Sequence, residues 1–153
     1  MRERPALKLA AFLPYRLNVA AAIVSEGLAR IYSQRFGIGV AEWRVLATVG
    51  EFHSITGKAI GQHAHMGKVK VSRAVAALEA RSLIQRIPNE EDLREAFLVL
   101  TAEGAHLYGE IALLAMAYVE RLEAAVSPGE LTALNAVLDK LMQRARELDQ
   151  PPI

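Results

Sequence analysis

The sequence predicts a mainly α-helical fold with one small β-hairpin. Hydrophobic residues recur at three- and four-residue spacing along most of the chain, which is typical of amphipathic helices. Only residues 83–87 and 96–100 form short apolar runs that suit strands, and a polar loop separates the two runs. A chain of 153 residues has the length of one compact domain, or of two small lobes that share a core.

Composition narrows the class of protein further. Hydrophobic residues make up 52% of the chain and charged residues 23%, as in a globular protein. The chain has no cysteine, which excludes thiol redox chemistry and thiolate metal sites. The longest apolar run, residues 111–119, is too short to span a bilayer, and Lys8 and Pro14 interrupt the first apolar stretch, so no signal peptide is expected. We therefore expect a cytoplasmic protein with no membrane partner.

Two helices are predicted at the start of the chain. Residues 8–36 follow a helical stripe, but Pro14 lacks the N–H that a helix interior needs. The helix should therefore begin near Leu13, after a separate arm or short turn. The Gly-Ile-Gly segment at 37–39 ends it, and a second helix covers residues 40–52. Trp43, the only tryptophan, is interpreted there as a core or interface plug rather than a ligand contact.

A helix-turn-helix is predicted next. Residues 54–57 form a turn in which Thr56 caps a short helix over residues 58–65. Met66 and Gly67 then separate this helix from another over about residues 67–81, and this order defines the motif. One stripe of the second helix recurs at i, i+3, i+4 and i+7 and should face the core: Val71, Ala74, Val75 and Leu78.

The opposite face of the 67–81 helix is small and flat, with cations near its N-terminal end. Its members are Val69, Ser72, Arg73, Ala76 and Ala80, with Lys70 and Ala77 on one shoulder. A solvated face normally carries long charged side chains, whereas this face can approach another surface closely. The free N–H groups at a helix N-terminus also favour phosphate. We interpret it as a DNA recognition helix, although on this helix alone an ordinary amphipathic helix is equally well supported.

Charge is distributed unevenly along the chain. The net charge is only +1, but residues 58–86 hold six Lys and Arg against one Glu, which gives +5. Residues 89–130 hold nine acidic residues against two Arg, which gives −7. The basic segment coincides with the predicted recognition helix, as expected for a nucleic-acid surface.

The second half of the chain completes the predicted fold. Residues 83–87 and 96–100 form a β-hairpin beside the helix-turn-helix, a wing whose tip carries Arg94. Thr101 can cap a helix over residues 102–126. Ser127, Pro128 and Glu130 form a capping box with the preferred proline at the start of a last helix that runs to about Leu148. A heptad seam follows this last helix: Leu131, Leu134, Leu138, Leu141, Ala145 and Leu148.

The predicted architecture is therefore a winged helix-turn-helix lobe plus a helical dimerisation lobe within one domain, residues 1–153. Residues 38–101 form the DNA-binding lobe, and residues 1–37 and 102–153 form the dimerisation helices. These helices carry more apolar surface than a small winged lobe needs. A helix-turn-helix reader usually works as a two-fold dimer on two half-sites, so we expect a homodimer.

Specific residues along this order resemble the MarR family of bacterial winged helix-turn-helix transcription regulators. The resemblance covers nearly the whole chain and is most specific over residues 40–105. It rests on Trp43–Leu46, Ser72-Arg73, Leu78-Glu79 to Leu83-Ile84, Asp92-Leu93-Arg94 and Leu100–Gly104. The chain departs from the family pattern at Ser82, where Gly is frequent, and at Ala77 and Leu93, where Arg is common.

The resemblance implies a dimeric regulator, often a repressor, that binds a pseudo-palindromic site in double-stranded DNA. Such regulators commonly release DNA when a small aromatic or anionic effector enters the cleft between the dimer helices and the winged lobe. The alternative is a winged-helix protein-interaction module that does not bind DNA. An enzyme is not expected, because no nucleophile–base pair or phosphate loop stands out and a catalytic domain would not fit in this length.

The site residues are assigned by their place in this scheme. Arg73 should read guanine bidentately, Val69 should touch a thymine methyl, and Arg94 should enter a minor groove while Asp92 holds its side chain. The expected phosphate contacts are Thr56, Lys68, Lys70 and Ser72. The expected effector contacts are Tyr15, Arg16, Trp43, His53 and Tyr118. No metal and no cofactor is expected.

Overall fold

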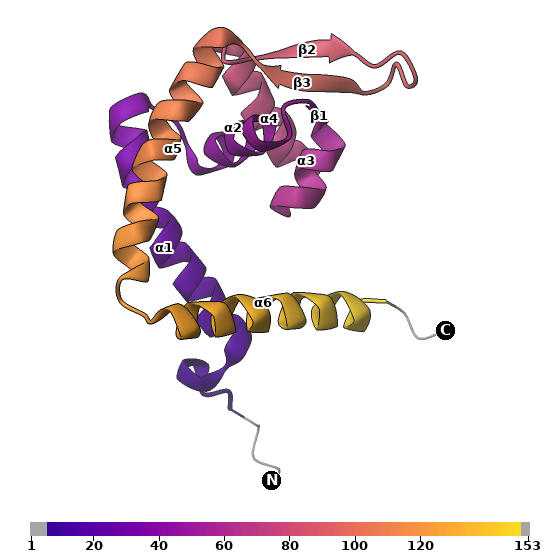
Figure 1. Ribbon diagram of the computed structural model, residues 1–153. Coiled ribbons are helices and arrows are strands. Elements are labelled where there is room, and N and C mark those ends of the chain that lie inside the picture. The colour runs from indigo at the N-terminus through magenta and orange to yellow at the C-terminus, as the bar shows by residue number, and fades with distance from the viewer. Residues whose placement is uncertain (1–5, 151–153) are drawn as a thin grey trace. The chain divides into compact units, whose positions relative to one another are not determined.

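The computed structural model describes residues 6–150, and its contacts divide the chain into two compact units, residues 1–114 and 115–153 (Figure 1). The predicted dimerisation segments extend to residues 1–5 and 151–153, which lie outside the described residues. The first unit contains η1 (Leu9–Ala11), α1 (Leu13–Phe36), α2 (Val40–Phe52), β1 (Ile55–Thr56), α3 (Gly57–Ala64), α4 (Lys68–Ala80), β2 (Ile84–Pro88), β3 (Ala96–Leu100) and the first half of α5 (Ala102–Glu123). The second unit contains the rest of α5 and α6 (Pro128–Leu148).

Local capping explains where these helices begin and end. Helix α1 begins at Leu13 with Pro14 in its first turn, as predicted, and ends at Gly37, whose φ of 64° places it in the left-handed region. The hydroxyl of Thr56 accepts a hydrogen bond from the Ala59 N–H at 3.2 Å and begins α3. At the start of α6, the Ser127 hydroxyl accepts from the Glu130 N–H at 3.2 Å, and the Ser127 N–H donates back to the Glu130 carboxylate at 2.8 Å.

The predicted turn at residues 54–57 was wrong in one respect, because it contains a short strand. Ile55 and Thr56 form β1, which pairs antiparallel with β3, Ile55 opposite Leu98 and Thr56 opposite Phe97. The sheet therefore has three strands in the order β1-β3-β2. Two residues are too few to show strand periodicity in a sequence, and the pairing comes from a segment about forty residues away along the chain.

Helix α5 ends three residues earlier than predicted, at Glu123 rather than Val126. Residues 124–126 leave the helix through tight turns, in which the Val126 N–H donates to the Glu123 carbonyl at 3.1 Å. The capping box of α6 accounts for this early end. Ser127 must adopt an extended backbone, with φ −75° and ψ 158°, to serve as the N-cap of the next helix.

The hydrophobic core of the first unit lies among α2, α3, α4 and the sheet. The predicted stripe of α4 is buried, as are Val45, Leu46 and Val49 on α2 and Ile60 on α3. Leu98, on the central strand β3, is 2% exposed. In Figure 1 the β2–β3 hairpin projects beyond the helices of this unit. None of the helices in the described part of the chain is long and apolar enough to cross a membrane.

Candidate nucleic-acid interface

Helix α4 presents the face that the sequence predicted to be outward. Its N-cap is Gly67, and the turn before it passes through His65 in the left-handed region, at φ 49°. Val71, Ala74, Val75 and Leu78 are each 4% exposed or less, whereas Val69 is 64% exposed. Ser72, Arg73, Ala76 and Ala80 are also exposed. The helix is therefore held by its apolar stripe and leaves a ridge of small side chains in solvent.

Two surface hollows flank the N-terminal half of α4. One is a groove of about 600 Å³ between α3, α4 and the hairpin, and its cationic lining is Lys58, Lys68, Arg86 and Arg94. The other is a hollow of about 740 Å³ between α4 and the start of α2, and its cationic lining is Lys68, Lys70 and Arg73. Lys68 lines both, and the exposed ridge of α4 stands between them. Positive side chains thus lie on each side of the ridge.

The cations around α4 differ in whether their charge is neutralised within the chain. Arg86, on β2, donates to the Glu79 carboxylate from Nε at 2.7 Å and from Nη2 at 3.2 Å, which ties the wing to α4. Among the described residues, the structure shows no ion pair for Lys58, Lys68, Lys70 or Arg73. These four side chains are therefore available to an external anion.

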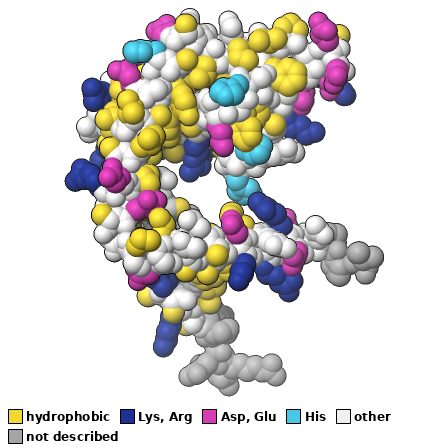
Figure 2. All heavy atoms as spheres, viewed as in Figure 1, with side chains coloured by type: hydrophobic (Ala, Val, Ile, Leu, Met, Phe, Trp, Pro, Cys, Tyr) yellow, Lys and Arg dark blue, Asp and Glu magenta, His cyan; other side chains and the backbone are white. Residues whose placement is uncertain are grey.

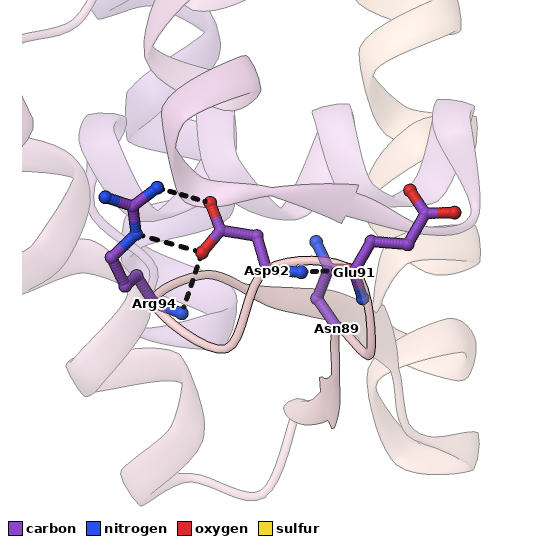
Figure 3. A network of polar contacts seen from close by, with 4 residues as sticks. All are labelled: Asn89, Glu91, Asp92 and Arg94. Carbon is purple, nitrogen blue, oxygen red and sulfur yellow. Dashed lines mark hydrogen bonds and ion pairs between the residues drawn. The ribbon is translucent and has the colours of Figure 1, made fainter.

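A polar network orders the tip of the wing (Figure 3). The Asn89 side-chain oxygen accepts from the backbone N–H groups of Glu91 at 3.1 Å and Asp92 at 3.2 Å. The Asp92 carboxylate accepts from Nε of Arg94 at 3.0 Å, from its Nη2 at 3.2 Å and from its backbone N–H at 3.1 Å. The hydrogen bonds from the Arg94 side chain, and then that from its backbone, hold the pKa of Asp92 below its usual value. The same contact raises the pKa of Arg94.

The wing tip is acidic apart from Arg94. Residues 89–95 contain Glu90, Glu91, Asp92 and Glu95 against this single arginine, for a local charge of −3. Leu93 is 88% exposed beside it. A wing of this kind approaches a phosphate backbone less favourably than a basic one, because like charges repel across short distances. Arg94 is paired with Asp92 within this acidic setting.

Trp43 lies half-buried against an aromatic cluster rather than in an open pocket. Its ring centroid is 5.7 Å from that of Tyr32 on α1 and 6.2 Å from that of Tyr108 on α5. Tyr32 is 2% exposed, and its burial raises the pKa of its hydroxyl against a smaller opposing effect of Arg44. The cluster ties α1, α2 and α5 together, which fits the interpretation of Trp43 as a plug.

The other predicted effector contacts are dispersed along the chain. Tyr15 and Arg16 lie in the first turn of α1, 17 residues before Tyr32, and at 1.5 Å per residue this is roughly 25 Å along the helix axis. His53 follows the end of α2, with φ 64°, and is exposed. Tyr118 belongs to the second unit. Within one chain Tyr15 does not lie beside Trp43, and the effector pocket stays a prediction.

Some residues of the groove were not singled out from the sequence. Lys58 and Arg86 both line it, yet they lie in α3 and β2, on either side of α4 in sequence. Their shared basic segment was visible in the sequence, but only the packing of the hairpin against α3 and α4 brings them together. In the described part of the chain, no three His, Asp or Glu side chains are grouped as a metal site would require.

A cationic second helix preceded by a short helix and a turn, and followed by an antiparallel hairpin, defines the winged helix-turn-helix class of proteins. Residues 36–95 match the sequence model of the MarR family. Over these residues, which are fewer than half of the chain, the protein is similar to the MarR family.

Individual proteins are similar to the chain in sequence or in fold. An uncharacterised HTH-type transcriptional regulator of Bacillus subtilis (strain 168), YwoH, is 29% identical over 112 residues, which cover 73% of this chain and 80% of YwoH. A mutant of MarR from E. coli, solved with operator DNA, superposes with a TM-score of 0.70 at 21% identity, over 82% of this chain and 93% of that one. NadR in complex with 4-hydroxyphenylacetate superposes with a TM-score of 0.76 at 23% identity, over 90% and 97% of the two chains.

Proposed function

We propose that the protein is a homodimeric repressor that binds a pseudo-palindromic site in double-stranded DNA. The observation that carries this proposal is the exposed ridge of α4 between two hollows lined by cations. The major groove of B-DNA is about 12 Å wide and admits one α-helix. A helix that enters it has a phosphate strand on each side, where Lys58, Lys68 and Lys70 can neutralise phosphates.

The residues of α4 and the wing divide into readers and anchors under this proposal. Arg73 reads a guanine edge with its two guanidinium donors, and Val69 contacts a thymine methyl. Arg94 enters the adjacent minor groove, oriented by Asp92. Thr56, Lys68, Lys70 and Ser72 contact the backbone and fix the position of the helix. Since its target is DNA, we place the protein in the cytoplasm.

Dimerisation is supported by apolar surface that one chain leaves uncovered. No residue of α6, all of which the structure describes, is buried. Leu134, Val137, Met142 and Leu148 of this helix are each at least 49% exposed. Hydrophobic side chains also lie at the surface along α5, as Figure 2 shows, where Leu113 and Met116 are 68% and 65% exposed. Exposed apolar area on this scale marks an interaction surface.

Effector control completes the proposal. A small aromatic or anionic molecule would release DNA by favouring a dimer whose recognition helices have the wrong spacing for the duplex. The bound 4-hydroxyphenylacetate of the similar NadR structure supports this choice of ligand class. The ligand must bind the DNA-incompatible arrangement of the dimer more tightly than the DNA-compatible one. A ligand with equal affinity for both arrangements would not shift the equilibrium between them.

Selection from a pool of random duplexes tests the proposal. We expect enrichment of an inverted repeat whose two halves lie about one helical turn apart. Gel-shift titration of the selected site at several salt concentrations should then show an affinity that falls steeply with salt. A screen of aromatic acids for release of the bound duplex follows. Failure to enrich any repeat, together with no salt-dependent shift, would favour the protein-interaction module instead.

A further inference from the structure

A side chain at the end of α4 holds the last carbonyl groups of α1. Arg81 directly follows α4, and its Nη2 donates to the Phe36 carbonyl at 3.0 Å while its Nη1 donates to the Gly37 carbonyl at 3.2 Å. The last carbonyls of a helix lack partners within the helix and carry its negative dipole end. A guanidinium whose two donors reach adjacent carbonyls satisfies both needs at once.

The residues that follow Arg81 form hydrogen bonds with the start of α5. The Thr101 hydroxyl donates to the Ser82 carbonyl at 2.6 Å, and the Thr101 N–H donates to the Leu83 carbonyl at 3.1 Å. Gly104 lies so close to the Leu83 carbonyl that a side chain there would collide with it. Residues 81–83, which we call the 81–83 turn, therefore join the end of α1, the end of α4 and the start of α5.

The 81–83 turn is rigidly connected to the recognition helix. The Ser82 N–H donates to the Glu79 carbonyl at 2.9 Å, and the Leu83 N–H donates to the Leu78 carbonyl at 3.0 Å. These bonds close the last turn of α4, as in a helix C-terminal motif. A displacement of the 81–83 turn relative to α1 is therefore transmitted to the C-terminal end of α4.

We propose that Arg81 is a positioning residue that fixes the direction of α4 relative to α1 and so sets the spacing between the two recognition helices of the dimer. The inference rests on the proposed function, since it takes α1 and α5 as dimer helices and α4 as the DNA reader. Loss of the two Arg81 hydrogen bonds removes the side-chain link between the end of α4 and the end of α1, and leaves α4 held by its core packing and by the contacts of the 81–83 turn with α5. The two recognition helices then sample a wider range of separations, and the protein discriminates less between half-site spacings.

The first arm of the test needs neither DNA nor a dimer. The chain has no cysteine, so Arg30→Cys on α1 and Ala76→Cys on α4 introduce two exposed sites for spin labels. Labelled protein diluted with unlabelled protein reports the distance within one chain by pulsed dipolar spectroscopy. We expect a narrow distribution for the parent, a broader or shifted one for Arg81→Ala, and an intermediate one for Arg81→Lys, which keeps the charge without the fork.

Arg35→Ala is the matched control. Arg35 also lies in the last turn of α1, with its guanidinium 5.6 Å from the Phe36 ring centroid, but it belongs to the same helix as the carbonyls. The substitution Arg35→Ala removes one positive charge near the C-terminal end of α1 without removing a link to α4. We expect its distance distribution to match that of the parent.

The second arm measures spacing selectivity with unlabelled protein. The selected duplex is compared with one that carries a single inserted base pair between the half-sites. The ratio of the two affinities should fall by about tenfold in Arg81→Ala, a coupling within the usual range, and stay unchanged in Arg35→Ala. A general loss of stability would lower both affinities and leave their ratio as it was.

The two arms separate failure of this inference from failure of the proposed function. If the parent protein bound no duplex, the DNA-binding proposal would be refuted. A broader distance distribution in Arg81→Ala would still support the link between α1 and α4. Arg81→Ala with parental distances, or with a parental affinity ratio on DNA, would overturn the role of Arg81 while DNA binding stood.

Discussion

Ser82 occupies a backbone conformation that favours glycine. Its φ of 56° lies in the left-handed region, which costs a residue with a side chain about 1–2 kcal/mol. Glycine avoids this cost but loses about 0.5–1 kcal/mol more backbone entropy on folding. We expect Ser82→Gly to raise the free energy of unfolding by about 0.5 kcal/mol, measured by urea denaturation. The strain at residue 82 thus gives a conformational reason for a glycine at this position.

A second serine provides the control for that change. Ser72 is exposed in the middle of α4, where glycine should lower the free energy of unfolding by about 0.5 kcal/mol. The two Ser→Gly changes should therefore have opposite signs. A loss of stability in Ser82→Gly equal to that in Ser72→Gly would contradict the strain assigned to residue 82.

Asp92 should titrate below its ordinary pKa of 3.8 because Arg94 donates to its charged form. A depressed pKa in the folded state means that the ion pair is intact above the ordinary value and is lost as the pH falls through the lower, folded value. Carboxyl-carbon NMR measures this titration directly. Arg94→Ala should return the pKa of Asp92 towards its ordinary value, whereas Arg86→Ala, which breaks the separate Glu79 pair, should not. An Asp92 titration unaffected by Arg94→Ala would exclude the assigned cause.

Removing either of two cations of α4 should change DNA binding, but in different ways. Arg73→Ala should cost about 1–3 kcal/mol of binding free energy and relax the preference at one base position, because a bidentate base contact is lost. Lys68→Ala should weaken binding to all sequences alike and reduce the slope of affinity against salt by about one, because a phosphate contact is lost. Gel-shift titration of both variants on the selected site, single-base variants of it and unrelated duplexes separates the two effects. Parental binding by both would remove these assignments.

At the scale of the elements, the wing carries a charge that opposes DNA binding. Among the residues that the structure describes, no ion pair involves Glu90 or Glu91, and Arg94 is paired with Asp92. The double change Glu90→Gln and Glu91→Gln should raise the affinity for all duplexes by about two- to threefold at low salt, with little gain at high salt because of screening. Glu120→Gln, on α5, is the control and should leave the affinity unchanged. An equal gain from both variants would indicate a net-charge effect rather than a wing contact.

The elements whose ends are set by nearby residues were predictable from the sequence. Pro14, Thr56 and Ser127 mark the starts of α1, α3 and α6, because a capping bond or a missing N–H acts within four residues. The buried stripe of α4 followed from its spacing alone. By contrast β1 depends on pairing with Leu98 across the sheet, which leaves no local pattern to find.

The candidate site was predictable to the same extent. The outward face of α4 follows from helical geometry, so Val69 and Arg73 could be placed before the structure was known. The contacts of Arg81 with α1 join residues 44 and 45 positions apart, and the groove lined by Lys58 and Arg86 depends on how the hairpin packs. A charged residue in a sequence shows its charge but not its partner.

At the scale of the whole molecule, the small net charge of +1 conceals two opposed regions. The +5 of residues 58–86 lies on α3, α4 and the start of the wing, and the −7 of residues 89–130 extends from the wing tip over α5 to the start of α6. Fields of this kind orient a protein as it approaches a charged partner more than they add affinity. The basic region should therefore turn α4 toward the duplex as the protein approaches it.

Affinity for a full site should therefore depend on two copies of α4 presented together, and α6 is the element that tests this. Leu134 lies in the heptad seam of α6 and is 51% exposed in the single chain. Fully burying an exposed leucine stabilises by about 1.5–3 kcal/mol, so the half-exposed Leu134 contributes about half of that, and a symmetric dimer loses two such contributions in Leu134→Glu. The dimer dissociation constant should thus rise by about ten- to a hundredfold, as light scattering over a concentration series would show.

DNA binding should follow the assembly state rather than the fold. Leu134→Glu should lower the affinity for the full inverted repeat towards that for an isolated half-site, because α4 and the wing are unchanged while the second contact is lost. Ala136→Glu, on the opposite side of the same helix, adds the same charge away from the seam and should leave both the dimer and the affinity intact. Circular dichroism should show equal helix content in the two variants. If Leu134→Glu became monomeric yet bound the full repeat as tightly as the parent, the paired presentation of α4 would not be the source of its affinity.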